Sequence, residues 1–180
     1  PFLNLRTYVK NNHEPGIQFL SEWLNNRLAV KLGPPIFNLP YRYGKLHYNH
    51  HFEKGELSGE VDAPRIGKLK YHANLPRHSD FRPAKRDSID EFLIERYTAF
   101  THRNGRKGFF RVWHEPWEVI PVEDLELTDL SLLHEILPGA RFVKAHFALR
   151  AADVWMGRPH HLKTEKTNKT KKHERFARRC

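Results

Sequence analysis

The chain has 180 residues, 39% of them hydrophobic and 12% aromatic, which suits one folded domain with a core of its own and excludes a chain that is disordered throughout. No apolar run approaches the roughly 20 residues that a helix needs to cross a bilayer, so no membrane span is predicted. The net charge is +10, but residues 163–180 carry eight Lys or Arg and two Glu, so the remainder has a net charge of only +4.

Short strands are predicted along the first half of the chain, because apolar and polar side chains alternate there. In residues 2–9 this alternation places Asn4, Arg6 and Tyr8 on one face. Gly and Pro clusters mark the breaks between the elements. The predicted elements are strand 2–9, a turn at 14–16, strand 16–21, a helix at 25–32 ended by 33–35, strand 41–52, a turn at 53–56, strands 57–61 and 68–73, and a loop at 75–86.

The clearest predicted helix covers residues 88–98, where Ser88 and Glu91 form a capping-box pattern. Its apolar positions recur at helical spacing, so we expect a buried stripe with Arg96 near its middle and Glu95 at its edge. That stripe contains Ile89, Phe92, Leu93, Tyr97 and Phe100. The remaining predicted elements are strand 109–113, a helix at 129–137, strands 142–149 and 153–156, and a disordered basic tail from residue 163. Many strands with few helices indicate a mainly β, α+β fold: a barrel or sandwich with helical additions.

The composition also limits partners and compartment. The folded part is only mildly basic, so nucleic-acid binding is not expected, except weakly through the tail. Cys180 is the only cysteine, so no internal disulfide can form, which suits a reducing compartment and a cytoplasmic protein. His47 and His51 share a predicted strand face with Asn49, but no Cys or acidic residue stands at ligand spacing, so no metal site is expected.

Three separated patches place a charged or titratable residue inside apolar sequence: residues 4–9, 92–97 and 114–117. A charge in such company must be paired or serve a ligand, because leaving it buried and alone costs several kcal/mol. In order and spacing these patches resemble the YqjF-like family of uncharacterised conserved bacterial proteins, a domain of unknown function. The other matching segments are residues 16–21, 39–41, 146–147 and 153–154.

This resemblance implies the acetoacetate-decarboxylase-like superfamily, whose fold is a closed or partly open antiparallel β-barrel with a few short helices around a ligand-sized pocket. It implies a YqjF-like domain over residues 1–162, lacking the front segment of the family, and a basic tail over 163–180. In the decarboxylase a Lys pair follows a Pro, and one Lys forms a Schiff base. The comparable place here, Pro40-Tyr41-Arg42, holds no Lys, and Arg cannot form the imine, so Schiff-base decarboxylation is not expected.

The patches predict a small-molecule pocket in which Arg6 or Arg96 holds an anionic group and aromatic side chains cover an apolar portion. Structural alternatives remain: Arg6 could pair with Glu95, Arg96 could serve the helix dipole, and His114 could bond a backbone carbonyl beside a turn. The predicted lining residues are Arg6, Tyr8, Tyr41, Glu95, Arg96, His114 and Trp117.

Three functions fit this pattern. The first is binding of an unknown small molecule, with no cofactor, by a chain that could form a homo-oligomer. The second is an enzyme that uses the same pocket, with Glu95 or His114 as proton donor or acceptor. The third is a structural or interaction domain that acts through its basic tail.

Overall fold

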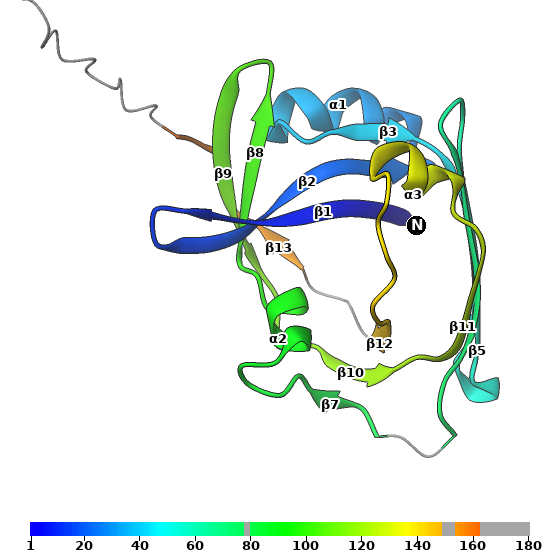
Figure 1. The fold of residues 1–180 in the computed structure, drawn as a ribbon. Helices are drawn as coiled ribbons and strands as arrows, with labels where there is room; N and C mark the ends of the chain where they lie inside the picture. The colour runs from blue at the N-terminus through cyan, green and yellow to red at the C-terminus, as the bar shows by residue number, and fades with distance from the viewer. Residues whose placement is uncertain (78–79, 149–153, 163–180) are drawn as a thin grey trace, which may run out of the picture.

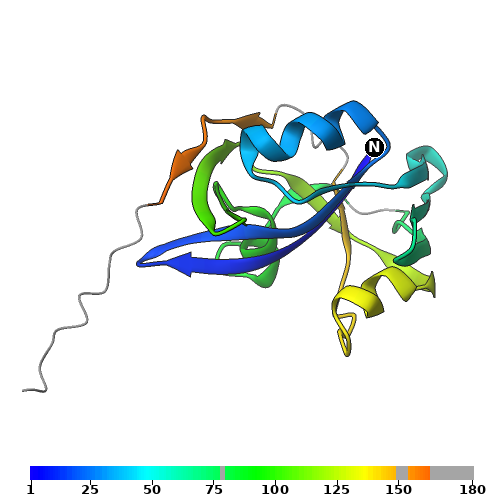
Figure 2. The same ribbon diagram turned by 90° about the horizontal axis from the view of Figure 1, so that it is seen from above.

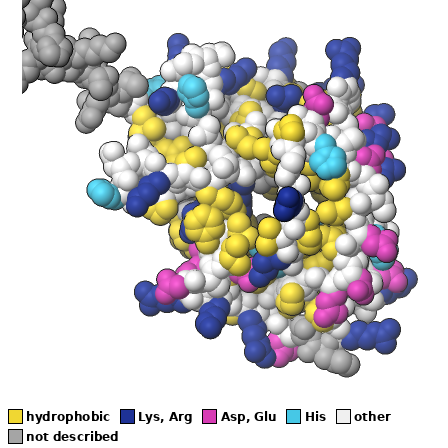
Figure 3. Space-filling view, in the orientation of Figure 1, with side chains coloured by type: hydrophobic (Ala, Val, Ile, Leu, Met, Phe, Trp, Pro, Cys, Tyr) yellow, Lys and Arg dark blue, Asp and Glu magenta, His cyan; other side chains and the backbone are white. Residues whose placement is uncertain are grey.

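The computed structural model describes residues 1–77, 80–148 and 154–162, and the predicted tail at 163–180 lies outside them. Strands predominate and form a curled, half-barrel arrangement that surrounds the centre of the molecule (Figure 1). Hydrophobic side chains gather around a hollow near the middle of this face (Figure 3). The prediction of a mainly β fold with a few short helices is confirmed.

The first sheet has the strand order β1-β2-β8-β9-β13, with β3 also paired to β2 and β14 to β9. β1 and β2 form a long antiparallel hairpin, whereas β2 runs parallel to β3 and β8. The strands are β1 (Phe2–Asn11), β2 (Glu14–Leu24), β3 (Tyr41–Tyr43), β8 (Thr98–Arg103), β9 (Arg106–Trp113), β13 (Trp155–Met156) and β14 (His160–His161).

The turn of the β1–β2 hairpin lies at residues 12–13, so the predicted turn at 14–16 is wrong. Asn12 adopts a left-handed φ of 53°, which Asn tolerates better than most residues. Pro15 and Gly16 continue the ladder, opposite Lys10 and Val9. A Cβ on Gly16 would lie only 2.6 Å from the carbonyl oxygen of Thr98, so glycine here permits the close approach of β8.

Helix α1 (Arg27–Phe37) is longer than predicted and contains the two prolines expected to end it. Asn26 caps its start by accepting hydrogen bonds from the backbone N–H groups of Leu28 and Ala29. The helix ends at Asn38, which has a left-handed φ of 58° and donates its N–H to the Pro34 carbonyl. Proline's fixed φ is compatible with a helix, but each of the two prolines lacks an N–H donor and its ring crowds the carbonyl four residues earlier.

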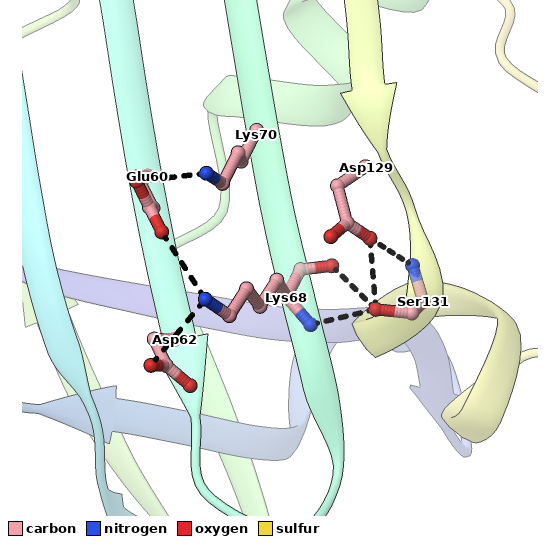
Figure 4. Close-up of polar contacts among 6 residues, drawn as sticks. All are labelled: Glu60, Asp62, Lys68, Lys70, Asp129 and Ser131. Carbon is pink, nitrogen blue, oxygen red and sulfur yellow. Dashed lines mark hydrogen bonds and ion pairs between the residues drawn. The ribbon is translucent and has the colours of Figure 1, made fainter.

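The second sheet has four antiparallel strands in the order β11-β6-β5-β4. The predicted strands 57–61 and 68–73 are confirmed as β5 and β6, but the predicted strand 41–52 is divided into β3 and β4, and β11 was not predicted. Gly44 separates β3 from β4, and there the chain passes from the first sheet to the second. Lys68 and Lys70 form exposed ion pairs with Glu60 on the adjacent strand (Figure 4). The strands are β4 (Lys45–His51), β5 (Glu56–Ala63), β6 (Gly67–Asn74) and β11 (Glu123–Asp129), and the 3-10 helix η1 (Phe52–Lys54) follows β4.

The third sheet joins short segments in the order β12-β10-β7. Within the described residues, the strand predicted at 142–149 is formed only at β12 and the one predicted at 153–156 only at β13, while positions 149 and 153 lie outside the described ranges. The strands are β7 (Arg82–Pro83), β10 (Glu118–Pro121) and β12 (His146–Ala148).

Helix α2 (Ile89–Ile94) ends four residues before the predicted boundary, and the predicted buried stripe is wrong. The capping prediction holds in part, since the Ser88 hydroxyl accepts from the Glu91 N–H at 3.2 Å. Phe92 is 46% exposed and Ile89 51%, so only Ile94 is buried in this helix. Residues from Thr98 onward join β8, because pairing with β2 and β9 outweighs a weak local helix preference.

Trp23 of β2 lies at the centre of the core that joins the first two sheets. It is fully buried and packs with Leu46 and Val61 of the second sheet and with Leu132 of α3 (Ser131–Ile136). Seen from above, α1 and α3 lie on opposite sides of the molecule (Figure 2). A second core cluster, around Ile17 and Phe110, joins β2, β8 and β9 to the end of α1.

Candidate functional site

The C-terminal end of α2 is the point where the sequence patches meet. The guanidinium of Arg6 donates from Nη2 to the backbone carbonyl of Leu93 at 2.7 Å, and the Tyr8 hydroxyl donates to the same oxygen at 2.8 Å. The last carbonyls of a helix have no intrahelical partner, so a cation and a hydroxyl satisfy this one well. Arg6 is therefore bonded to the α2 backbone, and Glu95 is bonded elsewhere.

Arg6, Tyr8, Phe92 and Arg96 form what we call the arginine–aromatic ladder. The Arg6 Cζ lies 5.8 Å from the Tyr8 ring centre, the Tyr8 and Phe92 rings are 4.7 Å apart, and the Arg96 Cζ lies 4.3 Å over Phe92. Arg96 also donates from Nη1 to the Glu95 carbonyl at 2.7 Å. Cation–π contacts and backbone carbonyls thus hold two guanidinium groups at the two ends of one stack.

Neither guanidinium is neutralised. Among residues 1–77, 80–148 and 154–162, no carboxylate lies within ion-pair distance of Arg6 or Arg96. The nearby carboxylate of Asp90 on α2 is paired with Lys144 at 2.6 Å. Burial lowers the pKa of His146, against the opposing effect of the Asp90 charge, and the charges of Lys144 and Arg6 lower it further. The Asp90 carboxylate is thus paired with Lys144 and not with an arginine of the ladder.

Beyond the ladder, Glu95 joins the second patch to the third. Its carboxylate accepts hydrogen bonds from the Tyr97 hydroxyl and from the Trp117 backbone N–H, the latter at 3.3 Å. Burial raises the pKa of Tyr97 to about 12, and the bond to Glu95 and the Glu95 charge act in the same direction. Both carboxylate oxygens of Glu95 thus already have partners within the protein.

His114 is buried in an aromatic stack next to this carboxylate. Its ring lies 4.3 Å from Trp117 and 5.0 Å from Tyr97, and its Nδ1 is 2.8 Å from the carbonyl of Glu115. The alternative in which His114 bonds a backbone carbonyl is the arrangement observed, in the irregular segment between β9 and β10. Because a carbonyl oxygen can only accept, Nδ1 is the donor in this bond.

Tyr41 packs against the same core cluster as Tyr8, and it lies in a strand row with Glu22, a carboxyl group that the sequence did not identify as a site residue. Asn4, Glu22 and Tyr41 are register partners on β1, β2 and β3. Glu22 is only 7% exposed, and burial raises its pKa from 4.5 to about 7. Burial also raises the pKa of Tyr41, and the Glu22 charge adds to this rise. The sequence feature that could have identified this carboxyl group is the position of Glu22 directly after the matched segment 16–21.

Metal-binding clusters and membrane-spanning helices are both absent from the described residues. No group of three or more His, Cys, Asp or Glu side chains there could hold a metal ion. No helix in these ranges is long and apolar enough to cross a membrane.

The architecture defines the class of protein: a curled, mostly antiparallel sheet with the acetoacetate-decarboxylase-like fold. The acetoacetate decarboxylase of Legionella pneumophila superimposes with a TM-score of 0.54 at 15% identity, covering 89% of this chain and 64% of that one. The enduracididine biosynthesis enzyme MppR complexed with pyruvate gives a TM-score of 0.51 at 11% identity, covering 89% and 63%. The same enzyme with HEPES buffer bound gives 0.53 at 13% identity, covering 89% and 62%.

The chain belongs to the DUF2071 family, described as uncharacterized conserved protein (COG2071), which matches residues 1–154. The uncharacterized protein YqjF of Bacillus subtilis (strain 168) is 34% identical over 123 residues, which are 65% of this chain. The chain spans about half the length of this curated relative, since the match covers 48% of it. The family and the fold implied by the sequence patches are both confirmed.

Proposed function

We propose that this chain binds a small organic molecule through a carboxylate held at the arginine–aromatic ladder. The observation that carries the proposal is the pair of guanidinium groups, Arg6 and Arg96, which backbone carbonyls and rings fix in place without a carboxylate partner in the described ranges. Cations fixed in this way attract an anion without first breaking an ion pair.

The ladder also has the donors and the apolar surface that such a ligand needs. A guanidinium carries five N–H donors, and Arg6 uses one group, Nη2, on the Leu93 carbonyl. The remaining donors suit the two oxygens of a carboxylate. Phe92 packs between Tyr8 and Arg96 but is still 46% exposed, so the open part of its ring offers apolar surface to the ligand. MppR, which shares the fold, is described in complex with pyruvate, a small carboxylate.

Arg6→Gln tests this proposal with pyruvate, benzoate and inorganic phosphate as probes, measured by isothermal titration calorimetry. We expect the unmodified chain to bind a carboxylate probe more tightly than phosphate. We expect Arg6→Gln to weaken that binding at least tenfold, because a charge-assisted bond contributes about 1.5–3 kcal/mol.

The matched control is Arg103→Gln, which removes the same charge from an exposed position on β8, outside the ladder, and should leave binding unchanged. Because Arg6 also bonds the α2 backbone, Arg96→Gln provides a second variant that leaves that bond intact. The proposal fails if no carboxylate probe binds the unmodified chain at millimolar concentration, or if both variants bind as it does.

A further inference from the structure

A cavity of about 800 Å³ lies along strands β4, β5 and β6, and none of the seven predicted site residues lines it. Cavities of this size typically hold ligands of drug-like dimensions. Its central row crosses three strands, because Tyr48 is the register partner of Gly59 and Gly59 that of Tyr71. Both tyrosines are half-buried and line the cavity.

The missing side chain at Gly59 allows the Tyr71 ring to lie across the neighbouring strand. A Cβ added at Gly59 would lie 2.4 Å from Tyr71 Cε1 and 2.6 Å from its Cζ, closer than real Cβ atoms approach other atoms. An aromatic ring that covers a strand glycine in this way shields the exposed backbone. The position of the Tyr71 ring, and so the shape of the cavity wall, depends on glycine at residue 59.

The hydroxyl hydrogens of the two tyrosines are already used by the protein. The Tyr48 hydroxyl donates to the Phe2 carbonyl at 3.1 Å, and the Tyr71 hydroxyl lies 2.7 Å from Nε2 of His50. Burial lowers the pKa of His50, which favours the neutral ring as the acceptor. The tyrosines therefore present ring surface and oxygen lone pairs to a ligand, which suits a ligand that donates a hydrogen bond.

The charged side chains in the lining neutralise each other. Lys70 lies 3.2 Å from Glu60, and Lys68, outside the lining, adds a second contact to Glu60 at 3.6 Å. The cavity thus differs in charge from the arginine–aromatic ladder and does not favour an anion.

We infer that this cavity is a second binding site, specific for a neutral, ring-containing molecule with a hydrogen-bond donor, such as an indole or phenol group. The ring packs against Tyr48 and Tyr71, and its N–H or O–H donates to a tyrosine oxygen. This site is independent of the carboxylate site proposed above, since it shares no residue with it.

Indole is the test probe, with affinity measured by calorimetry and the location by amide chemical shifts in NMR spectra. We expect indole to shift the Gly59 amide signal and to bind at least tenfold more weakly to Gly59→Ala, because the new Cβ displaces the Tyr71 ring. Tyr71→Phe, which keeps the ring and removes the acceptor oxygen, should weaken binding several-fold. Gly157→Ala is the matched control, because its Cβ would meet only ordinary contacts at 3.4 Å or more.

Arg6→Gln separates the two sites, since it should leave indole binding unchanged even if pyruvate binding is lost or never occurs. Thermal unfolding of each variant reports whether the fold survives the change. The inference is overturned if indole does not bind at millimolar concentration or shifts signals only outside β4–β6. The inference is also overturned if Gly59→Ala and Tyr71→Phe, both folded, bind indole as tightly as the unmodified chain does.

Discussion

Replacing Glu22 by glutamine is expected to stabilise the chain in mildly alkaline solution, by about 3 kcal/mol in the free energy of unfolding near pH 8. The folded-state pKa of Glu22 is raised from 4.5 to about 7 by burial. A carboxyl group with a raised folded-state pKa binds its proton more tightly in the folded chain. Its contribution to stability is complete below pH 4.5 and is lost as the pH rises through 7. Glutamine has the shape of the protonated acid but never ionises.

Urea denaturation near pH 4 and near pH 8 measures this difference. We expect Glu22→Gln and the unmodified chain to have similar stability at the lower pH and to diverge as pH increases. Glu53→Gln, at an exposed position, is the control and should not change the pH profile. Equal free energies of unfolding at the higher pH would show that Glu22 ionises without cost in the folded chain.

The raised pKa of Glu22 matters for function as well as stability. A carboxyl that is partly protonated near neutral pH can donate or accept a proton, which most carboxylates cannot do efficiently there. Among the carboxyl groups whose pKa shift is resolved in the described ranges, Glu22 is the one with a raised pKa, whereas Glu14, Glu60 and Asp129 have lowered pKa values. If the chain catalyses a reaction, Glu22 joins the earlier candidates Glu95 and His114, whose hydrogen bonds are made within the protein.

The sequence predicted most strands because apolar and polar side chains alternate along them, as in residues 2–9 and 57–61. It placed the end of α2 incorrectly, because Tyr97 and Phe100 continue the helical spacing of the apolar side chains before them. Thr98 instead pairs with Arg111 on β9, a contact that local sequence cannot reveal. Pairing between distant strands decides such boundaries.

The sequence indicated which patches lie near one another, but it did not indicate the bonds that they make. Three patches with charges in apolar company do meet at α2, since six of the seven predicted residues lie around its end. The partner of Arg6 is a backbone carbonyl, that of Leu93, and a carbonyl carries no signature in sequence. The cavity row formed by Tyr48, Gly59 and Tyr71 depends on the register of three strands, which alternation alone does not set.

Trp23→Ala is expected to lower the free energy of unfolding by about 3–5 kcal/mol, because it empties the core that joins the first two sheets. The Trp23 side chain is fully buried against residues of both sheets and of α3. Its indole N–H is also buried and has no hydrogen-bond partner among the described residues. Trp23→Phe therefore removes volume but breaks no hydrogen bond, so we expect a smaller loss of about 1–2 kcal/mol.

Chemical denaturation of the two variants, with Trp113→Ala as the matched control, separates these contributions. Trp113 is 53% exposed, so the same truncation there should change the free energy of unfolding by less than about 1 kcal/mol. A loss for Trp23→Phe as large as that for Trp23→Ala would mean that the indole N–H makes an important bond in solution. A small loss for both variants would mean that the two sheets are held together without this core. If the loss of stability is largest for Trp23→Ala, smaller for Trp23→Phe and smallest for Trp113→Ala, then packing around the Trp23 side chain holds the first two sheets together.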